Sequence, residues 1–449
     1  MSMPRWSAPT LGAPRVGRYV PHTPEQTAAM LATLGKQSLE DLFAVVPAAL
    51  RADAAPDLGP GLEEPQLASL LGQMARANRA SDLACFAGGG YYDRYLPAAQ
   101  RALMSRGEFL TAYTPYQPEV SQGTLQATFE FQSLVSELTG LPVATAGLYD
   151  GSTALAEAAL MARAATGRST VLVSPGVHPE WRAVLETYAA GQGVQVATLG
   201  EGQTPPETVA CVIWQQPDFY GRVHDLASEI AARPSGALAV VAADPSTLGV
   251  LEAPGRLGAD IVVAEGQGIG LPLSYGGPYL GLMAARGELL RRLPGRICGE
   301  SRDARGRRAF VLTLQAREQH IRRARATSNV CTNQALCGLA VTIYLSLLGP
   351  TGLRRLGEIC LARAHYLAAR LARIPGLALA YPDAPFFSEF AVRVPDAPAH
   401  MRQLADRGFL VGPVVDARTV LVAVTERRER AELDGLAAAW EGVIAGGAV

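Results

Sequence analysis

Short apolar runs separated by helical stretches fill the middle of this chain, from about residue 170 to residue 285. Continuous apolar strands that alternate with helices are typical of a mainly parallel β-sheet covered on both faces. Ligands of such sheets gather at the carboxyl ends of the strands. The runs that predict strands are residues 171–173, 194–196, 211–214, 238–241, 260–263 and 279–282.

Helical patterns flank this region on both sides. Apolar residues at helical spacing predict a helix from about Ser121 to Thr139 with Gly140 as its C-cap. Beyond residue 330 a helical segment leads to short strands and helices of a smaller α+β region. The sequence therefore predicts a helical N-terminal arm over residues 1–110, a large α/β domain over 111–330 and a small C-terminal α+β domain over 331–449.

Composition and charge exclude several classes of function. A chain of 449 residues with 49% hydrophobic residues can bury a large core. Its net charge of −1, with both signs mixed, makes nucleic acid and anionic membranes unexpected partners. No apolar run approaches the ~20 residues of a membrane helix, and the N-terminus lacks a secretion signal. Six cysteines without a CxxC pair predict a reducing, cytoplasmic setting and no metal site.

Lys36 is the only lysine in the chain, so 39 of the 40 Lys and Arg residues are arginine. An arginine guanidinium stays protonated and cannot form an imine. Lys36 lies between two predicted short helices, the first opened by a capping box at Thr23 and the second starting at Ser38. We expect Lys36 to be a solvated surface residue, because lysine is almost never fully buried without a partner.

Three positions lie where a pyridoxal-phosphate enzyme with a large and a small domain would build its site. Ser152 and Thr153 open a predicted helix whose N–H groups could hold a phosphate, although either residue could simply be its N-cap. Asp244 follows a predicted strand and could hold a protonated pyridine nitrogen, although it could also cap the turn that follows. After the next strand, Gln267 and Gly268 stand where such an enzyme would present its imine-forming lysine.

Two other kinds of site are not supported by this region. Gly266 and Gly268 suggest a dinucleotide-binding loop, but Leu271 stands at the third glycine position and Pro272 follows it. A serine-nucleophile elbow of the type GxSxG is missing as well.

The run from Tyr113 to Gly123 combines two prolines with hydrogen-bonding side chains. Pro115 and Pro118 restrict the backbone, which is how a rigid polar site would be built. A stiff loop that leads into the following helix is equally consistent with the pattern. The polar side chains of this run are Tyr113, Thr114, Tyr116, Gln117, Glu119 and Ser121.

This run, together with residues 311–323 and 326–332, resembles the P-protein family of the glycine cleavage system, the glycine decarboxylases. The likeness covers nearly the full chain. More specifically, the chain resembles the N-terminal subunit of those family members that are split into two polypeptides. The departures are mild, since Ala324 and Arg325 stand where relatives often have an acidic residue and a lysine.

The resemblance implies a pyridoxal-phosphate transferase fold of type I and a heterodimer or a dimer of heterodimers. In the family the C-terminal subunit carries the cofactor lysine and the N-terminal subunit has lost it, which fits Gln267 and Gly268. The complex would decarboxylate glycine and pass the aminomethyl group to the lipoyl arm of the H-protein, with pyridoxal phosphate on the partner subunit. The polar side chains from Tyr113 to Ser121 would reach across to line the partner's site, leaving Ser152, Thr153 and Asp244 as vestigial positions.

Two further hypotheses remain open from the residues alone. The chain could be an autonomous enzyme on the same fold that uses another nucleophile or no covalent cofactor. It could also be a cofactor-free scaffold or regulatory protein whose ancestral site is empty.

Overall fold

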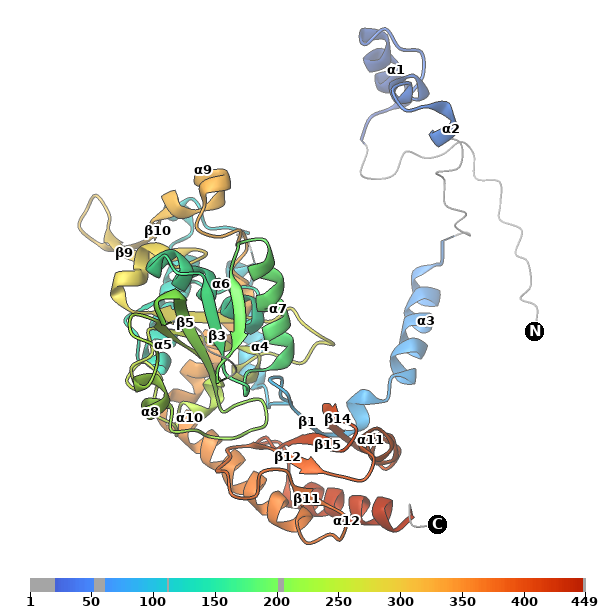
Figure 1. The fold of residues 1–449 in the computed structure, drawn as a ribbon. Helices are drawn as coiled ribbons and strands as arrows, with labels where there is room; N and C mark the ends of the chain where they lie inside the picture. Colours follow the sequence, from blue (N-terminus) through green and yellow to red (C-terminus); the bar gives the residue numbers. More distant parts are fainter. Residues whose placement is uncertain (1–20, 52–60, 111–112, 201–205, 447–449) are drawn as a thin grey trace. The chain divides into compact units, whose positions relative to one another are not determined.

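The computed structural model describes residues 21–51, 61–110, 113–200 and 206–446 (Figure 1). The chain divides into two compact units, residues 1–81 and 82–449. The second unit contains both the large sheet and the C-terminal sheet, so the boundaries predicted at residues 110 and 330 remain predictions.

The described residues of the first unit form short helices and the turns between them. Thr23 caps the first of them with the predicted capping box, whereas the helix expected from Ser38 is only a 3-10 turn at Glu40–Phe43. Lys36 is exposed, as expected. Only Leu31 is buried among the described residues of this unit, so its described part has no substantial hydrophobic core. Its α-helices are α1 (Pro24–Thr33), α2 (Ala48–Arg51) and α3 (Glu64–Ala77).

A seven-stranded sheet organises the second unit. Its strand order is β2-β8-β7-β6-β5-β3-β4. The five neighbouring strands β7-β6-β5-β3-β4 are parallel, and β8 pairs antiparallel with both β7 and β2. This confirms the predicted, mainly parallel sheet. The strands are β2 (Val143–Ala144), β3 (Thr170–Val173), β4 (Gln195–Thr198), β5 (Val209–Gln216), β6 (Leu238–Ala243), β7 (Ile261–Glu265) and β8 (Gly281–Ala285).

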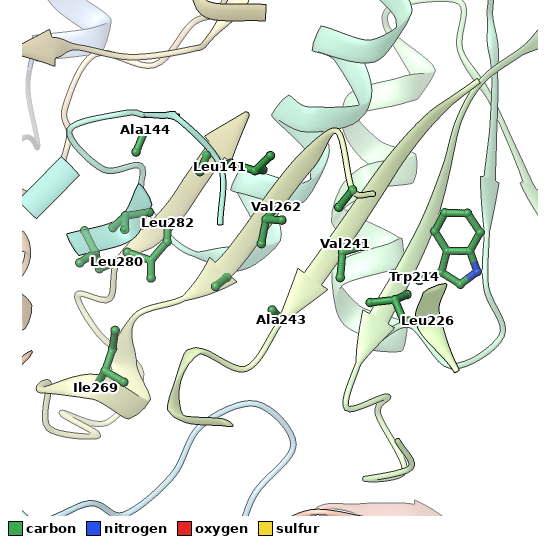
Figure 2. Close-up of a cluster of buried hydrophobic side chains, with 14 of the residues drawn as sticks. Leu141, Ala144, Trp214, Leu226, Val241, Ala243, Val262, Ile269, Leu280 and Leu282 are labelled. Carbon is green, nitrogen blue, oxygen red and sulfur yellow. The ribbon is translucent and has the colours of Figure 1, made fainter. Parts of the chain in front are cut away.

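Apolar side chains cover both faces of this sheet. Neighbouring residues of one strand point to opposite faces, so Val212 and Trp214 belong to one buried cluster and Cys211 and Ile213 to the other. Figure 2 shows part of the first cluster, where Val241 and Val262 lie side by side on adjacent strands. The helices that pack on the sheet are α5 (Gln122–Thr139), α6 (Gly151–Thr166), α7 (Pro179–Ala190) and α8 (Leu226–Ala231).

The long element α10 (Ala335–Leu371) joins the sheet to the C-terminal region. It is long and apolar enough to cross a membrane by length and composition. However, it is broken at Gly349, whose φ is 60°, and it is a core helix. Its first half contributes Tyr344 to the core of the large sheet, and its second half contributes Leu367 to the C-terminal core.

The C-terminal region is the predicted smaller α+β structure. It contains a four-stranded antiparallel sheet of the order β11-β12-β15-β14. A separate parallel pair joins β1 (Ala84–Ala87) to β13 (Phe409–Gly412), a pairing that the sequence did not predict. The remaining elements are β11 (Ala378–Leu379), β12 (Glu389–Arg393), α11 (Ala397–Asp406), β14 (Val414–Asp416), β15 (Thr419–Ala423) and α12 (Arg430–Gly446).

Candidate functional site

The position expected for an imine-forming lysine lies directly after β7. Gln267 occupies it and is fully buried. Its side-chain Nε2 donates to the carbonyls of Tyr92 and Leu271 at 2.9 and 3.0 Å, and its Oε1 accepts from the Tyr92 N–H at 2.8 Å. A lysine has no acceptor for that N–H group. Gln267 is therefore a structural link between two backbone segments, and the neighbouring Gly268 lines the adjacent pocket.

The N-terminus of α6, where a phosphate would bind, holds a carboxylate of its own. Asp150 is the N-cap, because its Oδ1 accepts from the Thr153 N–H at 2.8 Å. The Ser152 hydroxyl donates to the same oxygen at 2.6 Å. The alternative that Ser152 or Thr153 is the N-cap is wrong, because Asp150 precedes the helix with an extended backbone and a strong acceptor.

Glu265 brings a second carboxylate to the same helix end. Its Oε2 accepts from the Gly151 N–H at 2.9 Å, and its Oε1 accepts from the N–H groups of Gln267 and Leu280 at 2.9 and 3.2 Å. Burial raises the pKa of Glu265 to about 7, although these backbone donors oppose the shift. The chain thus uses its own side chains where an external anion would be bound.

The pocket at the carboxyl ends of the strands is nearly filled. About 40 Å³ remains free in it, space for a few waters and far below the ~300 to 1,000 Å³ of a small-molecule site. Glu389 of β12 closes it: its Oε1 accepts from the Gly89 N–H at 2.7 Å and its Oε2 from the Tyr92 hydroxyl at 2.9 Å. The backbone is close as well, since a Cβ at Gly221 would lie 1.9 Å from the Glu389 carbonyl oxygen.

Asp244 lines this pocket at the end of β6. Its Oδ1 accepts from the N–H and the hydroxyl of Ser246 at 2.9 and 2.8 Å, so it caps the turn as one of the two alternatives predicted. Ser246 accepts in turn from the buried guanidinium of Arg94 at 2.7 Å. The expected role of Asp244 at a pyridine nitrogen stays a prediction.

These residues do not fit pyridoxal phosphate. No amine is present at the lysine position, and the N–H groups of Gly151 and Thr153 at the start of α6 already bond to carboxylates. The free volume is too small for the cofactor. His178 is also committed, because its Nε2 lies 2.9 Å from the Gly89 carbonyl and its Nδ1 accepts from the Glu180 N–H at 3.1 Å.

The segment from Tyr113 to Ser121 has the opposite character. Tyr113 is 83% exposed and Tyr116 is 49% exposed. Gln117 and Glu119 are exposed too, and their side chains form no hydrogen bond or ion pair among the described residues. Thr114 and Ser121 are half-buried. The loop is nevertheless fixed, since Pro115 is buried and Gln122 bonds both to the Pro118 carbonyl and to the backbone of Phe310.

A buried arginine lies beneath Tyr116. Arg296 is 5% exposed, its guanidinium carbon lies 5.7 Å from the Tyr116 ring centroid, and its Nη2 donates to the Tyr116 hydroxyl at 3.4 Å. Its Nη1 donates to Asn333 at 3.1 Å. The Nε of Arg296 and the Oε1 of Glu318 are buried without hydrogen-bond partners among the described residues. The His320 ring lies 5.7 Å from that of Tyr116. Three stretches distant in sequence therefore meet at Tyr116.

Residues 17–440 match the family model of the glycine cleavage system P-protein. The chain belongs to this family. The probable glycine dehydrogenase (decarboxylating) subunit 1 of Moorella thermoacetica is 48% identical over 446 residues, with 95% of this chain and 100% of the relative covered. The corresponding P-protein relative of Sorangium cellulosum is 46% identical, with 95% and 99% covered.

Solved structures agree with this assignment. The crystal structure of a glycine decarboxylase (P-protein) of the glycine cleavage system, in inhibitor-bound form, has a TM-score of 0.86 and 46% identity, with 95% of this chain and 100% of that one covered. Sphingosine-1-phosphate lyase of Burkholderia pseudomallei and glutamate decarboxylase of Lactobacillus brevis each have a TM-score of 0.63, at 16% and 15% identity. These two show the fold alone. The predicted type I fold of pyridoxal-phosphate enzymes is confirmed.

Sequence reasoning missed several residues of both regions. Glu389 enters the pocket from more than 100 residues further along the chain, and no local pattern signals it. Glu265 lies two residues before Gln267, in the segment where a lysine was expected. Its place at the end of an apolar strand was the signal that could have marked it as a residue of the pocket. Arg296 gave no signal, because only the fold brings it to Tyr116.

Proposed function

We propose that this chain is the N-terminal, lysine-free subunit of glycine decarboxylase in the glycine cleavage system. Together with a lysine-bearing subunit, it decarboxylates glycine and transfers the aminomethyl group to the lipoyl arm of the H-protein. The observation that carries the proposal is the filled pocket, in which Glu265 and Glu389 bond to backbone N–H groups that a cofactor would need. Beside the pocket, Gln267 holds the position expected for the cofactor lysine. A member of the P-protein family with such a pocket requires a partner that binds the cofactor.

Pyridoxal phosphate, when bound by the partner subunit, would absorb the electron pair that loss of carbon dioxide leaves. This chain's part is to bind and orient. The Tyr116 hydroxyl, the Gln117 amide and the Glu119 carboxylate offer donors and acceptors on a loop fixed by Pro115. We place this loop at the edge of the partner's site, in a heterodimer or a dimer of heterodimers in the cytoplasm.

A second candidate is a cofactor-free scaffold or regulatory protein on the same fold. The filled pocket favours it as much as it favours a lysine-free subunit. The exposed side chains of Gln117 and Glu119, which have no partner among the described residues, argue for the subunit, because polar groups held in place without partners suit a ligand that arrives from another molecule.

The test is purification of the chain alone and together with the lysine-bearing subunit. We expect glycine-dependent exchange of carbon dioxide, in the presence of lipoylated H-protein, only from the two subunits together. The chain alone should self-associate, because its first unit buries only Leu31 among the described residues and exposed apolar surface drives association. Exchange by the chain alone would establish an autonomous enzyme. A monodisperse chain that ignores the other subunit would favour the scaffold.

A further inference from the structure

Positive charge is concentrated in one stretch of this nearly neutral chain. Residues 300–325 contain eight arginines and three acidic residues, a net charge of +5 in a chain whose total is −1. The stretch comprises the hairpin of β9 (Ile297–Arg302) and β10 (Arg308–Thr313) and the short helix α9 (Gln319–Arg322) that follows it. Figure 1 shows the hairpin and α9 at the same end of the large domain.

Most of these charges are exposed and have no acidic partner. Two of the eight are paired, since Arg307 lies 2.8 Å from Asp303 and Arg308 lies 3.0 Å from Glu300. Arg317 is half-buried and bonds to backbone carbonyls. The other five are exposed and form no ion pair among the described residues. These five define the arginine surface: Arg302, Arg305, Arg322, Arg323 and Arg325.

The arginine surface borders the loop that we assign to the partner's site. Gln122, directly after the loop, bonds to the backbone of Phe310 in β10 with distances of 2.9 Å in both directions. On the other side the Tyr116 ring lies 5.7 Å from the ring of His320 in α9. Ile321 adds an exposed apolar side chain between the arginines, with 53% of its surface accessible.

We propose that the arginine surface docks the lipoylated H-protein through an acidic face of that protein. The proposal rests on the proposed function, which requires a carrier to bring its arm to the site beside Tyr116. The charge of the surface predicts the sign of its partner, since complementary potentials steer association. Cores of permanent subunit interfaces are apolar and depleted of charge, whereas unpaired exposed charges suit a partner that binds and leaves in each cycle.

The experiment measures binding of lipoylated H-protein to the complex of the two subunits. The test variant combines Arg302→Glu, Arg305→Glu and Arg325→Glu. The control combines Arg354→Glu, Arg373→Glu and Arg402→Glu, which are exposed arginines without ion pairs among the described residues elsewhere in the same unit. Both variants change the net charge equally, so any general effect of charge on association is matched.

We expect the association rate constant of the test variant to fall at least about tenfold at low ionic strength. The parent rate should fall steeply as salt is added, and the test variant's rate should change little. The control should stay within about twofold of the parent. Glycine turnover with free lipoamide as a small acceptor should be the same in all three proteins.

Three results would overturn the proposal. The test and control variants could bind H-protein equally well, the parent's association could be independent of salt, or the test variant could fail to assemble with the lysine-bearing subunit. The last result would assign the surface to the permanent interface. Failure of the proposed function would be a separate result, because the parent complex would then turn over glycine with neither acceptor. The binding measurement would still decide whether the arginine surface docks the carrier.

Discussion

The pocket at the ends of the strands and the loop from Tyr113 to Ser121 differ in whether their polar side chains are buried and hydrogen-bonded. In the pocket, the buried carboxylates of Glu265 and Glu389 accept hydrogen bonds from the chain's own N–H groups and from the Tyr92 hydroxyl, and almost no free volume remains. In the loop, Gln117 and Glu119 are exposed without partners, although Pro115 and Gln122 fix the backbone that carries them.

This difference separates a site that is closed on itself from one that is open to another molecule. Buried polar groups are nearly always hydrogen-bonded, so a pocket whose carboxylates Glu265 and Glu389 both bond internally has little left to offer a ligand. Among its lining residues, the indole N–H of Trp181 is buried without a hydrogen-bond partner in the described structure. Beneath the loop, the Nε of Arg296 and the Oε1 of Glu318 have no hydrogen-bond partner among the described residues, and Arg296 Nε lies 3.8 Å from the Oε2 of Glu318. We therefore expect the contribution of this chain to turnover to depend on the loop. We do not expect its own pocket to bind the cofactor.

The largest effect should come from Gln267→Lys, which places a lysine directly after β7, beside the closed pocket. It leaves the Tyr92 N–H without its acceptor and buries an ammonium, at a cost of about 3 to 5 kcal/mol in the free energy of unfolding. Denaturant titration measures this loss. Incubation with pyridoxal phosphate followed by borohydride should label neither parent nor variant stoichiometrically. A variant as stable as the parent that takes up one cofactor would show that the pocket is not closed.

A pH-dependent loss of stability should come from Glu389. Burial raises the pKa of its carboxyl group to about 7, opposed by the Gly89 N–H and the Tyr92 hydroxyl. Because the folded pKa lies above the unfolded value, this contribution is complete below about pH 4.5 and is lost as pH rises through 7. The slope between pH 5 and 7 should be about 1.4 kcal/mol per pH unit.

Glu389→Gln isolates this slope, since an amide can accept from Gly89 and donate to Tyr92 in the same places. Other titrating groups are common to both proteins, so the difference between their unfolding free energies reports on Glu389. The parent should lose stability relative to the variant across that range. Parallel curves would mean that Glu389 is ionised throughout the range and that its burial is compensated.

The loop should matter for turnover and not for assembly. Tyr116→Phe and Gln117→Ala each remove hydrogen-bonding groups, and a lost contact to a polar or charged group costs ~1.5 to 3 kcal/mol, or about one to two powers of ten in rate. Glycine turnover of the two-subunit complex measures the effect. Tyr275→Phe removes the same hydroxyl from an exposed tyrosine elsewhere and should change nothing. Turnover within about twofold of the parent in both loop variants would reduce the segment to a stiff leader of α5.

The sequence predicted the large sheet well, because its strands are continuous apolar runs that need no distant information. It predicted α5 and its Gly140 cap for the same reason, since spacing and a left-handed glycine are local signals. It could not predict the pairing of β1 with β13, which joins segments more than 300 residues apart. The closing of the pocket by Glu389 and the placement of Arg296 under Tyr116 are likewise tertiary, so the lysine's absence was evident from sequence but the way its site is filled was not.

The smallest effect should come from Ser152→Ala at the start of α6. The Ser152 hydroxyl only donates to Asp150, and a typical intramolecular hydrogen bond contributes ~0.5 to 1.5 kcal/mol. The loss should be at the low end of that range, because the Asp150 carboxylate keeps its bond to the Thr153 N–H. Denaturant midpoints of parent and variant measure it.

The same substitution also tests whether the N-terminus of α6 binds an anion, when parent and variant are compared in the presence of inorganic phosphate. A ligand that binds only the folded state raises the melting temperature as its concentration increases. Because Glu265 and Asp150 already accept from the N–H groups of Gly151 and Thr153, phosphate should raise the melting temperature no more in the parent than in Ser152→Ala. A phosphate-dependent increase in the parent that the variant lacks would show that Ser152 still serves an anion site, and the contrast between a closed pocket and an open loop would fail at this point.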